Sequence, residues 1–354
     1  MIKFLKPSNE NAVLEAFPSF GFQAEDGTWR VQVSGWAYFP YKPTRRKRLV
    51  LHMLSRVMHA SEEDLNSEIF KRRVEKFVSD GSAGHEISFR LGDFQKKLHR
   101  KNKRNGHFRE WVRLSKEQVE TNSVVDANGR RTLNFQIETE LSQIKPIDSH
   151  ANLLSGKGLS IISDIDDTIK VSNVDDRHQL LANTFLREFQ GIDGMAELYN
   201  DWFQQGADFH YVSSSPWQLH APLLDLQDRG GFPGGTIHLR NFQLRNHVVQ
   251  RALLIRRHGK STSIKSLLQA LPDRKFILIG DSGEKDPEIY RKICRKYSGQ
   301  IAGMFIRDMK HNPVDAERLA KCRDAIPNVV CEKFESADDL RKLALPVLGS
   351  ALQV

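Results

Sequence analysis

Short apolar runs separated by longer helical stretches dominate the chain after residue 158 and constrain its fold most. Apolar runs of this length, alternating with helices, are typical of buried strands that are covered on both faces of a parallel sheet. We therefore predict a three-layer α/β domain. Its predicted strands are Leu159–Ile162, Phe209–Val212, Thr236–Leu239, Phe276–Ile279 and Ile301–Ile306. Its predicted helices include Asn183–Phe189, Met195–Gln204, Trp217–Asp228 and Thr262–Ala270.

The residues before this domain favour β structure. Thr28–Phe39 alternates apolar with polar side chains, and the turn sequence Ala24–Gly27 before it indicates a hairpin. Ser61 and Asp64 have the spacing of a capping box, which predicts the start of a helix. Several short strands with polar turns suggest a small sandwich-like domain. The further predicted strands are Val74–Val78, Glu86–Leu91, His107–Leu114 and Arg131–Ile137.

A segment rich in Pro, Ser and Gly, Leu141–Gly158, separates the two patterns and is predicted to be the linker. We therefore divide the chain into a mainly-β domain, 1–148, and an α/β domain, 149–354.

The positive charge is unevenly spread along the chain. The net charge is +9, and the first 155 residues contain 26 Lys and Arg against 19 Asp and Glu. The remaining residues contain 27 against 25, so most of the excess lies in the first part. Such a surface attracts anionic lipid or nucleic acid, and the alternative is a solvated basic face without a partner.

Neither a membrane span nor a disulfide framework is indicated. No apolar stretch approaches the roughly 20 residues that cross a bilayer, and the first residues lack a secretory signal. Cys294, Cys322 and Cys331 form no CxxC pair, which is typical of reduced thiols. These features predict a cytoplasmic protein that binds membranes, if at all, at their surface.

Polar side chains follow three of the predicted strands directly. Asp164, Asp166 and Thr168 follow the first strand, Ser213 follows the second, and Asp281 and Asp286 follow the fourth. Ligands of open α/β sheets bind at the carboxyl ends of the strands. Carboxylates that gather there repel one another unless a cation is present, and Mg²⁺ is a hard cation that prefers oxygen ligands and also binds phosphate. The chain has no GxxxxGK[ST] loop, so P-loop nucleotide chemistry is not indicated.

Three of these segments carry a specific resemblance. Asp164–Thr168 matches the DxDx[TV] motif of the haloacid dehalogenase superfamily, Ser213 fits its second motif, and Gly280–Asp286 fits its fourth. The longer strings Ile162–Val171, Tyr211–Trp217 and Phe276–Asp286 resemble the actin-patch-protein type of phosphatidate phosphatase and its bacterial relatives. The resemblance covers about residues 158–308.

This resemblance implies a mechanism and a role for each motif residue. Asp164 attacks phosphorus and forms an aspartyl-phosphate, and Asp166 protonates the leaving oxygen and then activates water. Mg²⁺ is held by Asp164, the backbone carbonyl of Asp166, and Asp281. Asp286 lies one layer further out or helps to hold a metal-bound water. Ser213 binds a phosphoryl oxygen.

The superfamily also requires a cation, usually Lys, beside the phosphorylated aspartate. Two lysines compete for this role. The spacing to Ile264 favours Lys260, and Lys265 is the alternative. The interval between the second and third motifs carries Arg240, Arg245, Arg251, Arg256 and Arg257, which form either an anion-binding cap or a solvated basic helix.

Three functions remain in play. The first is a phosphatidate phosphatase recruited to anionic membranes by the basic runs Thr44–Arg48, Lys71–Arg73 and Lys96–Arg104. The second is the same chemistry on a soluble phosphomonoester. The third is a nucleic-acid or scaffold-binding protein with a degenerate phosphatase fold. The complete set of motif residues argues against the third, and few aromatic residues accompany the basic runs, which disfavours nucleic acid. The oligomeric state is not indicated.

Overall fold

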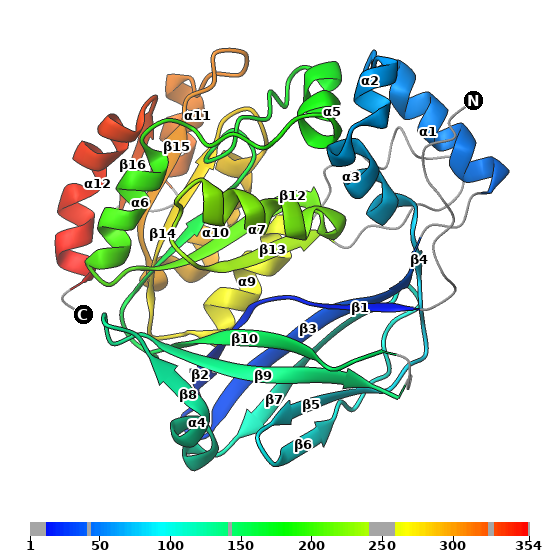
Figure 1. Ribbon diagram of the computed structural model, residues 1–354. Coiled ribbons are helices and arrows are strands. Elements are labelled where there is room, and N and C mark those ends of the chain that lie inside the picture. Colours follow the sequence, from blue (N-terminus) through cyan, green and yellow to red (C-terminus); the bar gives the residue numbers. More distant parts are fainter. Residues whose placement is uncertain (1–11, 41–43, 141–143, 241–258, 325–328, 353–354) are drawn as a thin grey trace. The chain divides into compact units, whose positions relative to one another are not determined.

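A computed structural model describes residues 12–40, 44–140, 144–240, 259–324 and 329–352 (Figure 1). The chain divides into two compact units, with the division between Ser155 and Gly156. Val57–Ala60 groups with the second unit. Each unit has its own sheet, so each is described by itself.

The first unit is a mixed, mainly antiparallel sheet of ten strands. Its strands are β1 (Val13–Ala16), β2 (Ser19–Gln23), β3 (Trp29–Phe39), β4 (Asp80–Gly81), β5 (Ile87–Leu91), β6 (Phe94–Lys97), β7 (His107–Leu114), β8 (Ser123–Val125), β9 (Arg131–Thr139) and β10 (Ile147–Leu154). Its helices are α1 (Arg45–Val57), α2 (Glu62–Asn66), α3 (Glu68–Val78) and α4 (Lys116–Asn122). The main path runs β1-β3-β2-β10-β9-β5-β6, and β7 pairs with β3.

One buried cluster forms the interior of this unit. Residues from β3 and β7, such as Val31 and Val112, belong to the same cluster as Phe89 of β5 and Ile137 of β9. Because alternate residues of a strand point to opposite faces, these strands direct every second side chain into the common core. The predicted mainly-β domain is confirmed.

Two sequence predictions in this unit are wrong. Val74–Val78, predicted as a strand, is the last part of α3, because Phe70, Val74, Phe77 and Val78 recur at helical spacing and bury one face. The linker prediction is wrong for Ile147–Leu154, which forms β10 and pairs with both β2 and β9, although the division between the units lies within the predicted segment. The predicted boundary between residues 148 and 149 falls inside this strand. The capping box is confirmed, since the Ser61 hydroxyl accepts a hydrogen bond from the backbone N–H of Asp64.

The second unit is a six-stranded, wholly parallel sheet with helices (Figure 1). Its strands are β11 (Leu159–Ser163), β12 (Asp208–Pro216), β13 (Thr236–Arg240), β14 (Lys275–Asp281), β15 (Ile301–Arg307) and β16 (Val330–Phe334). Its helices are α5 (Arg177–Phe185), α6 (Met195–Gln204), α7 (His220–Arg229), α9 (Gly259–Ala270), α10 (Asp286–Tyr297), α11 (Ala316–Arg323) and α12 (Ala337–Ala351), with short 3₁₀ turns at Trp217–Leu219 and Ser298–Gln300.

The strand order β13-β12-β11-β14-β15-β16 places the first strand in the middle of the sheet. From β11 the chain moves outward on one side to β12 and β13, then crosses to β14 on the other side. Right-handed crossovers in opposite directions put the helices on opposite faces. Accordingly, α9 contacts α10 and α10 contacts α11, whereas α6 contacts α12. The predicted three-layer α/β fold is confirmed, and among the described strands of this sheet β16 is the one that the sequence did not predict.

The amino ends of the central strands are tied together by one buried arginine. Arg274 donates hydrogen bonds to the Ser160 hydroxyl at 2.7 Å and to the carbonyl oxygens of Lys157 and Leu159 at 2.9 Å, and it pairs with Asp208. This cation fixes β11 against β12 and β14 at the edge opposite the polar strand ends.

Candidate active site

The carboxyl edge of the parallel sheet gathers most of the side chains that the sequence singles out. Asp164 follows β11, Ser213 lies near the end of β12, and Asp281 ends β14. Because β11 lies between β12 and β14, these three tips are neighbours. The chain reverses direction across the sheet at β11, and ligands of open α/β sheets bind at such a switch point.

Asp164 is held rigidly beside a lysine. Its side chain is 1% exposed, and its backbone N–H donates to the carbonyl of Ile279 at 2.8 Å. Its Oδ1 lies 2.7 Å from Nζ of Lys260, and its Oδ2 accepts a hydrogen bond from the Thr168 hydroxyl at 3.2 Å. The carboxylate is therefore fixed in orientation next to a positive charge.

Lys260, rather than Lys265, lies among the carboxylates. Lys260 is 1% exposed near the start of α9, and its Nζ lies 2.5 Å from Oδ1 of Asp286 and 3.8 Å from Oε2 of Glu284. Lys265 lies further along α9 and is half-buried. Glu284 was not predicted as part of the site.

Asp281 and Asp286 complete a buried acidic cluster with Asp164. One carboxylate oxygen from each lies within 4.8 Å of the others. Asp286 approaches closely because residue 280 is glycine, where a Cβ would lie 2.2 Å from Oδ2 of Asp286. That same oxygen accepts a hydrogen bond from the backbone N–H of Asp281 at 3.3 Å, so the loop after β14 is closed on itself.

Burial and mutual repulsion shift the pKa values of the three carboxyl groups upward. Burial raises the pKa of Asp164 to about 7, against the lowering effect of Lys260. Burial, together with Asp286 and Asp164, raises the pKa of Asp281 to about 10. Burial also raises the pKa of Asp286. Burial alone would lower the pKa of Lys260, but Asp164 and Asp286 raise it well above its ordinary value. The single positive charge of Lys260 therefore does not neutralise the three carboxylates of this cluster.

A divalent cation fits these residues. Oδ2 of Asp281 is buried and receives no hydrogen bond from any residue that the structure describes. The donors are carboxylate oxygens, which hard cations such as Mg²⁺ prefer. A cation would also relieve the repulsion that raises the pKa values. The cluster can therefore hold a metal ion.

The side chain of Asp166 points to a different set of partners. Its Oδ1 lies 2.8 Å from Nζ of Lys170 and accepts a hydrogen bond from the Ser172 hydroxyl at 2.7 Å. Its Oδ2 accepts from the hydroxyls of Ser213 at 2.9 Å and Ser215 at 2.8 Å. The carboxyl group of Asp166 thus lies outside the acidic cluster, and the sequence analysis assigned only its backbone carbonyl to the metal.

The loop after the first motif is shaped by Asp167, which sequence reasoning left without a role. Asp167 has a positive φ of 55°, and its carboxylate accepts hydrogen bonds from the backbone N–H groups of Ser172, Asn173 and Val174. Its carbonyl accepts from Arg307 at 2.8 Å. The sequence shows only that Asp167 directly follows Asp166. It does not show which backbone groups the Asp167 side chain contacts.

The remaining candidates lie apart from this centre or outside the described residues. Arg245, Arg251, Arg256 and Arg257 lie outside the described residues, whereas Arg240 ends β13 and is half-buried. Asp175, on the loop after the first motif, lies with its Oδ2 3.6 Å from Nδ1 of His311.

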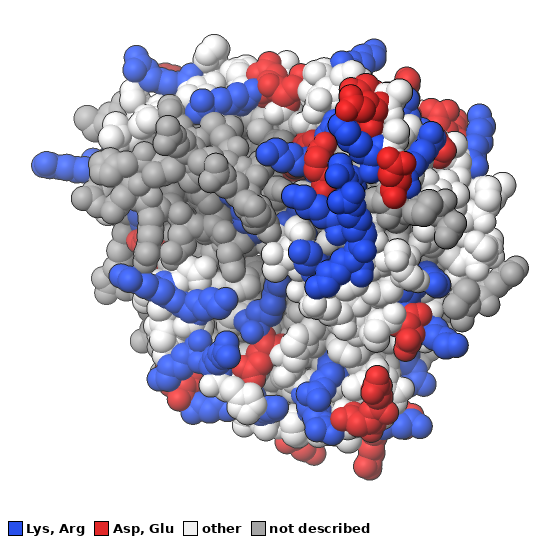
Figure 2. Space-filling model, turned by 180° about the vertical axis from the view of Figure 1, so that it is seen from behind, with Lys and Arg blue, Asp and Glu red and all other residues white. Residues whose placement is uncertain are grey.

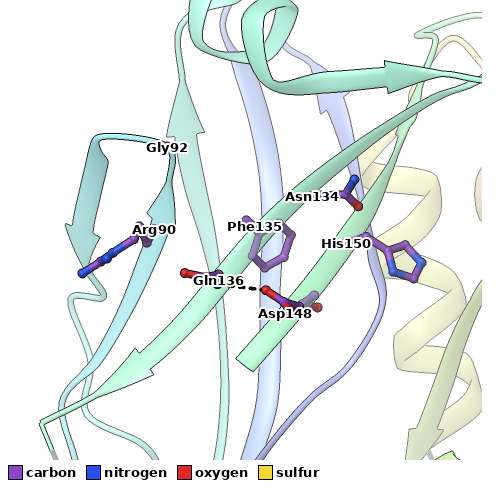
Figure 3. A pocket seen from close by; sticks show the side chains of 8 residues that line it. Arg90, Gly92, Asn134, Phe135, Gln136, Asp148 and His150 are labelled. Carbon is purple, nitrogen blue, oxygen red and sulfur yellow. Dashed lines mark hydrogen bonds between the residues drawn. The ribbon is translucent and has the colours of Figure 1, made fainter. Parts of the chain in front are cut away.

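A separate pocket of about 570 Å³ lies in the first unit, on strands β5, β9 and β10 (Figure 3). Arg90, Gln136 and Asp148 lie across it in register on three adjacent strands, and Gln136 donates a hydrogen bond to Asp148 at 3.0 Å. His150 also lines it, and burial lowers the pKa of that imidazole. None of the predicted site residues lines this pocket.

The part of the chain that carries the motifs is similar to one known protein family. Residues 159–308, which carry every motif described above, match the model of the phosphatidate phosphatase APP1 catalytic domain. These residues therefore carry the similarity of the chain to the APP1 phosphatidate phosphatase catalytic domain family. The predicted resemblance is confirmed.

Two fungal proteins show how far this similarity extends. The chain is 35% identical over 175 residues to phosphatidate phosphatase APP1 of Saccharomyces cerevisiae, covering 46% of this chain and 29% of the yeast protein. It is 35% identical over 179 residues to an uncharacterized protein of Schizosaccharomyces pombe, covering 49% and 29%. The chain thus spans less than a third of the length of these relatives.

The likeness of the chain to a solved structure is weak. A mutant of the PilB minor pilin from Streptococcus sanguinis matches at 10% identity over 76% of this chain and 88% of the pilin chain, with a TM-score of 0.28.

Proposed function

We propose that this protein is a Mg²⁺-dependent phosphatase that hydrolyses phosphatidate to diacylglycerol through an aspartyl-phosphate on Asp164. The observation that carries the proposal is the buried group of Asp164, Lys260, Asp281 and Asp286 at the carboxyl edge of β11 and β14. Similarity to this family supports the substrate class, since the yeast relative is named a phosphatidate phosphatase.

Asp164 would act as the nucleophile. Its carboxylate attacks phosphorus in line with the leaving oxygen, forming an O–P bond while the P–O bond to the diacylglycerol oxygen breaks. Lys260, whose Nζ lies 2.7 Å from Oδ1, balances the negative charge of the free carboxylate. After the first step it balances the charge of the phosphoryl group that is attached to Asp164. The burial of Asp164 supports this role, because bulk water does not compete with its carboxylate for the hydrogen bonds of the Lys260 ammonium.

Asp166 would move the protons. In the first step it donates a proton to the leaving alkoxide, and in the second it takes one from the water that attacks the aspartyl-phosphate. The products are diacylglycerol and inorganic phosphate, and Asp164 and Asp166 return to their starting states. Ser213, whose hydroxyl lies 2.9 Å from Oδ2 of Asp166, is close enough to bind a phosphoryl oxygen beside this proton carrier.

Mg²⁺ would be held by the carboxylates of Asp164 and Asp281 and by the backbone carbonyl of Asp166, with Asp286 adjacent. When bound, it supplies positive charge that offsets the repulsion between an anionic nucleophile and an anionic phosphate. Oδ1 of Asp286 already lies 2.5 Å from Nζ of Lys260. Oδ2 of Asp281, which has no hydrogen bond among the described residues, is therefore the oxygen best suited to a cation.

The first unit would bring the enzyme to an anionic membrane. No helix among the described residues is long and apolar enough to cross a bilayer. Lys and Arg are spread over one face of the molecule, interspersed with acidic groups (Figure 2). In the 96–104 run, Arg100, Lys103 and Arg104 are exposed, whereas Arg73 of the 71–73 run is buried and not available to a surface.

Phosphate release with and without Mg²⁺ tests the proposal. We expect phosphatidate in mixed micelles to be hydrolysed faster than lysophosphatidate, sugar phosphates and nucleotides, and Asp164→Asn to release no phosphate from any of them. Preference for a soluble phosphomonoester would overturn the substrate assignment. Absence of Mg²⁺-dependent release from every substrate would overturn the chemistry.

A further inference from the structure

Both oxygens of the Asp166 carboxylate are engaged by side chains, and the two sets of partners differ. Oδ1 contacts Lys170 at 2.8 Å and Ser172 at 2.7 Å, both on the loop that follows the first motif. Oδ2 contacts Ser213 at 2.9 Å and Ser215 at 2.8 Å, both near the end of β12. The carboxyl group is therefore fixed against rotation, with Oδ1 toward the loop after the first motif and Oδ2 toward the end of β12.

Lys170 is a buried lysine whose ammonium contacts Asp166. It is 3% exposed, its Nζ also donates to the Ser172 hydroxyl, and the same ammonium lies 4.7 Å from the ring centroid of Phe189. Burying an ammonium is costly unless it is paired. Lys170 therefore has a defined position, and Ser172, which is 0% exposed, links it to Asp166 a second time.

The loop is also held by contacts that do not involve the side chain of Lys170. The Asp167 carboxylate already accepts hydrogen bonds from three consecutive backbone N–H groups of the loop, Ser172 to Val174. The ammonium of Lys170 instead forms an ion pair with Asp166.

We infer that Lys170 and Ser172 are positioning residues that hold Oδ1 of Asp166 inward, so that Oδ2, beside Ser213, is the oxygen that exchanges protons with the leaving group and with water. This inference rests on the proposed function, because it assigns the reacting oxygen of the proposed acid–base residue. It assigns no contact between Lys170 and the substrate.

Leaving-group dependence tests this inference, since only a leaving group that needs a proton depends on Asp166. Lys170→Met keeps the apolar stem beside Phe189 and removes the donor, and Ser172→Ala removes the second donor. The quantity to measure is kcat/KM, which reports formation of the aspartyl-phosphate, for an alkyl phosphate and for p-nitrophenyl phosphate. Lys321→Met, at an exposed lysine paired with Glu317, is the control and should match the wild type.

For the alkyl phosphate we expect Lys170→Met to lower kcat/KM by about 100-fold, the lower end of general acid contributions. Ser172→Ala should lower it by about fivefold, the effect of one neutral hydrogen bond. For p-nitrophenyl phosphate both losses should stay under about threefold, because the aryl oxide departs without a proton. Equal losses on the two substrates would mean a general structural role and would overturn the inference.

A double-mutant cycle gives the second readout. In an Asp166→Asn background, Lys170→Met should have less than about a twofold further effect, since a positioning residue acts only through its partner. Full additivity would overturn the inference. Circular dichroism and a thermal melt check folding, and if Lys170→Met does not fold, the substrate dependence of Ser172→Ala decides alone. A wild-type protein without phosphatase activity would overturn both proposals, whereas an active wild type with unaffected variants would overturn this one only.

Discussion

Lys260 and Asp286 form a buried ion pair, with Nζ 2.5 Å from Oδ1, in which the same ammonium also reaches Asp164. One side chain from the start of α9 thus joins the tips of β11 and α10.

Lys260→Met should abolish phosphatase activity and destabilise the protein by about 3–5 kcal/mol, because it leaves buried carboxylates without their counter-ion. Lys265→Met, at a half-buried residue of the same helix, is the matched control and should leave activity and the melting temperature unchanged. The measurement is phosphate release beside a thermal melt. Activity in Lys260→Met comparable to the wild type would contradict the assigned role.

Asp164→Asn should eliminate turnover while the melting temperature stays the same or rises, because the amide removes one charge from a repelling cluster. Asp166→Asn should hydrolyse alkyl phosphates very slowly but still accumulate a phosphorylated protein from p-nitrophenyl phosphate, since only the second step then needs a base. Intact-protein mass spectrometry after acid quench detects the added phosphoryl group. Its presence in Asp164→Asn would show that another residue is the nucleophile.

Asp281→Ala should raise the Mg²⁺ concentration needed for half-maximal activity more than Asp286→Ala does. The reason is that Oδ2 of Asp281 has no hydrogen bond among the described residues, whereas Asp286 is engaged by Lys260 and by the backbone of Asp281. Excess chelator should stop the wild-type reaction, and added Mg²⁺ should restore it. A titration of activity against Mg²⁺ for the three proteins decides the order.

The metal-free protein should lose stability as pH rises from about 5 to 9. The pKa of Asp164 is raised to about 7 and that of Asp281 to about 10, from an ordinary value of 3.8. The folded state therefore binds these protons more tightly than the unfolded state, and that stabilising contribution is present below 3.8 and is lost as pH passes the folded-state values.

Mg²⁺ replaces those protons, so it should raise the melting temperature more at pH 8 than at pH 6. Thermal melts at both pH values, with Mg²⁺ or with chelator, measure this difference. An equal effect of Mg²⁺ at the two pH values would argue against a cation at the acidic cluster.

Charge reversal of Arg100, Lys103 and Arg104 to Glu should weaken sedimentation with anionic vesicles and leave hydrolysis of p-nitrophenyl phosphate nearly unchanged. These side chains are exposed, and the design spares Leu98 and Asn102, which are buried. The loss should be largest at low salt, because charges are screened over about 8 Å at physiological ionic strength.

The matched control for this surface reverses three other exposed basic residues of the first unit, Lys116, Arg131 and Lys145. It should sediment like the wild type if the 96–104 run itself contacts lipid. Equal loss in both reversals would indicate a diffuse charge effect, and no loss in either would leave the run as a solvated surface.

The sequence predicted the parallel sheet well because its strands are buried on both faces. β11 and β14 are buried along nearly their whole length, and the apolar runs Ile161–Ile162 and Phe276–Ile279 within them stand out against the helices between them. The edge strand β16 has the burial pattern of a half-exposed segment, and its mixed residues gave no such run. β10 escaped for a related reason, since alternate residues such as Asp148 and His150 lie outside the core and read as a polar linker.

What the sequence by itself determined about this protein is the order of the motifs and the strand ends on which they lie, because strand tips are set by local apolar patterns. Only the tertiary structure decided which lysine joins the acidic cluster, since Lys260 and Lys265 lie five residues apart on one helix and only one of them faces Asp164. It also revealed that Lys170, Ser172 and Ser215 converge on Asp166. Such contacts depend on how loops from different strands meet in space, and residue spacing along the chain does not contain that information.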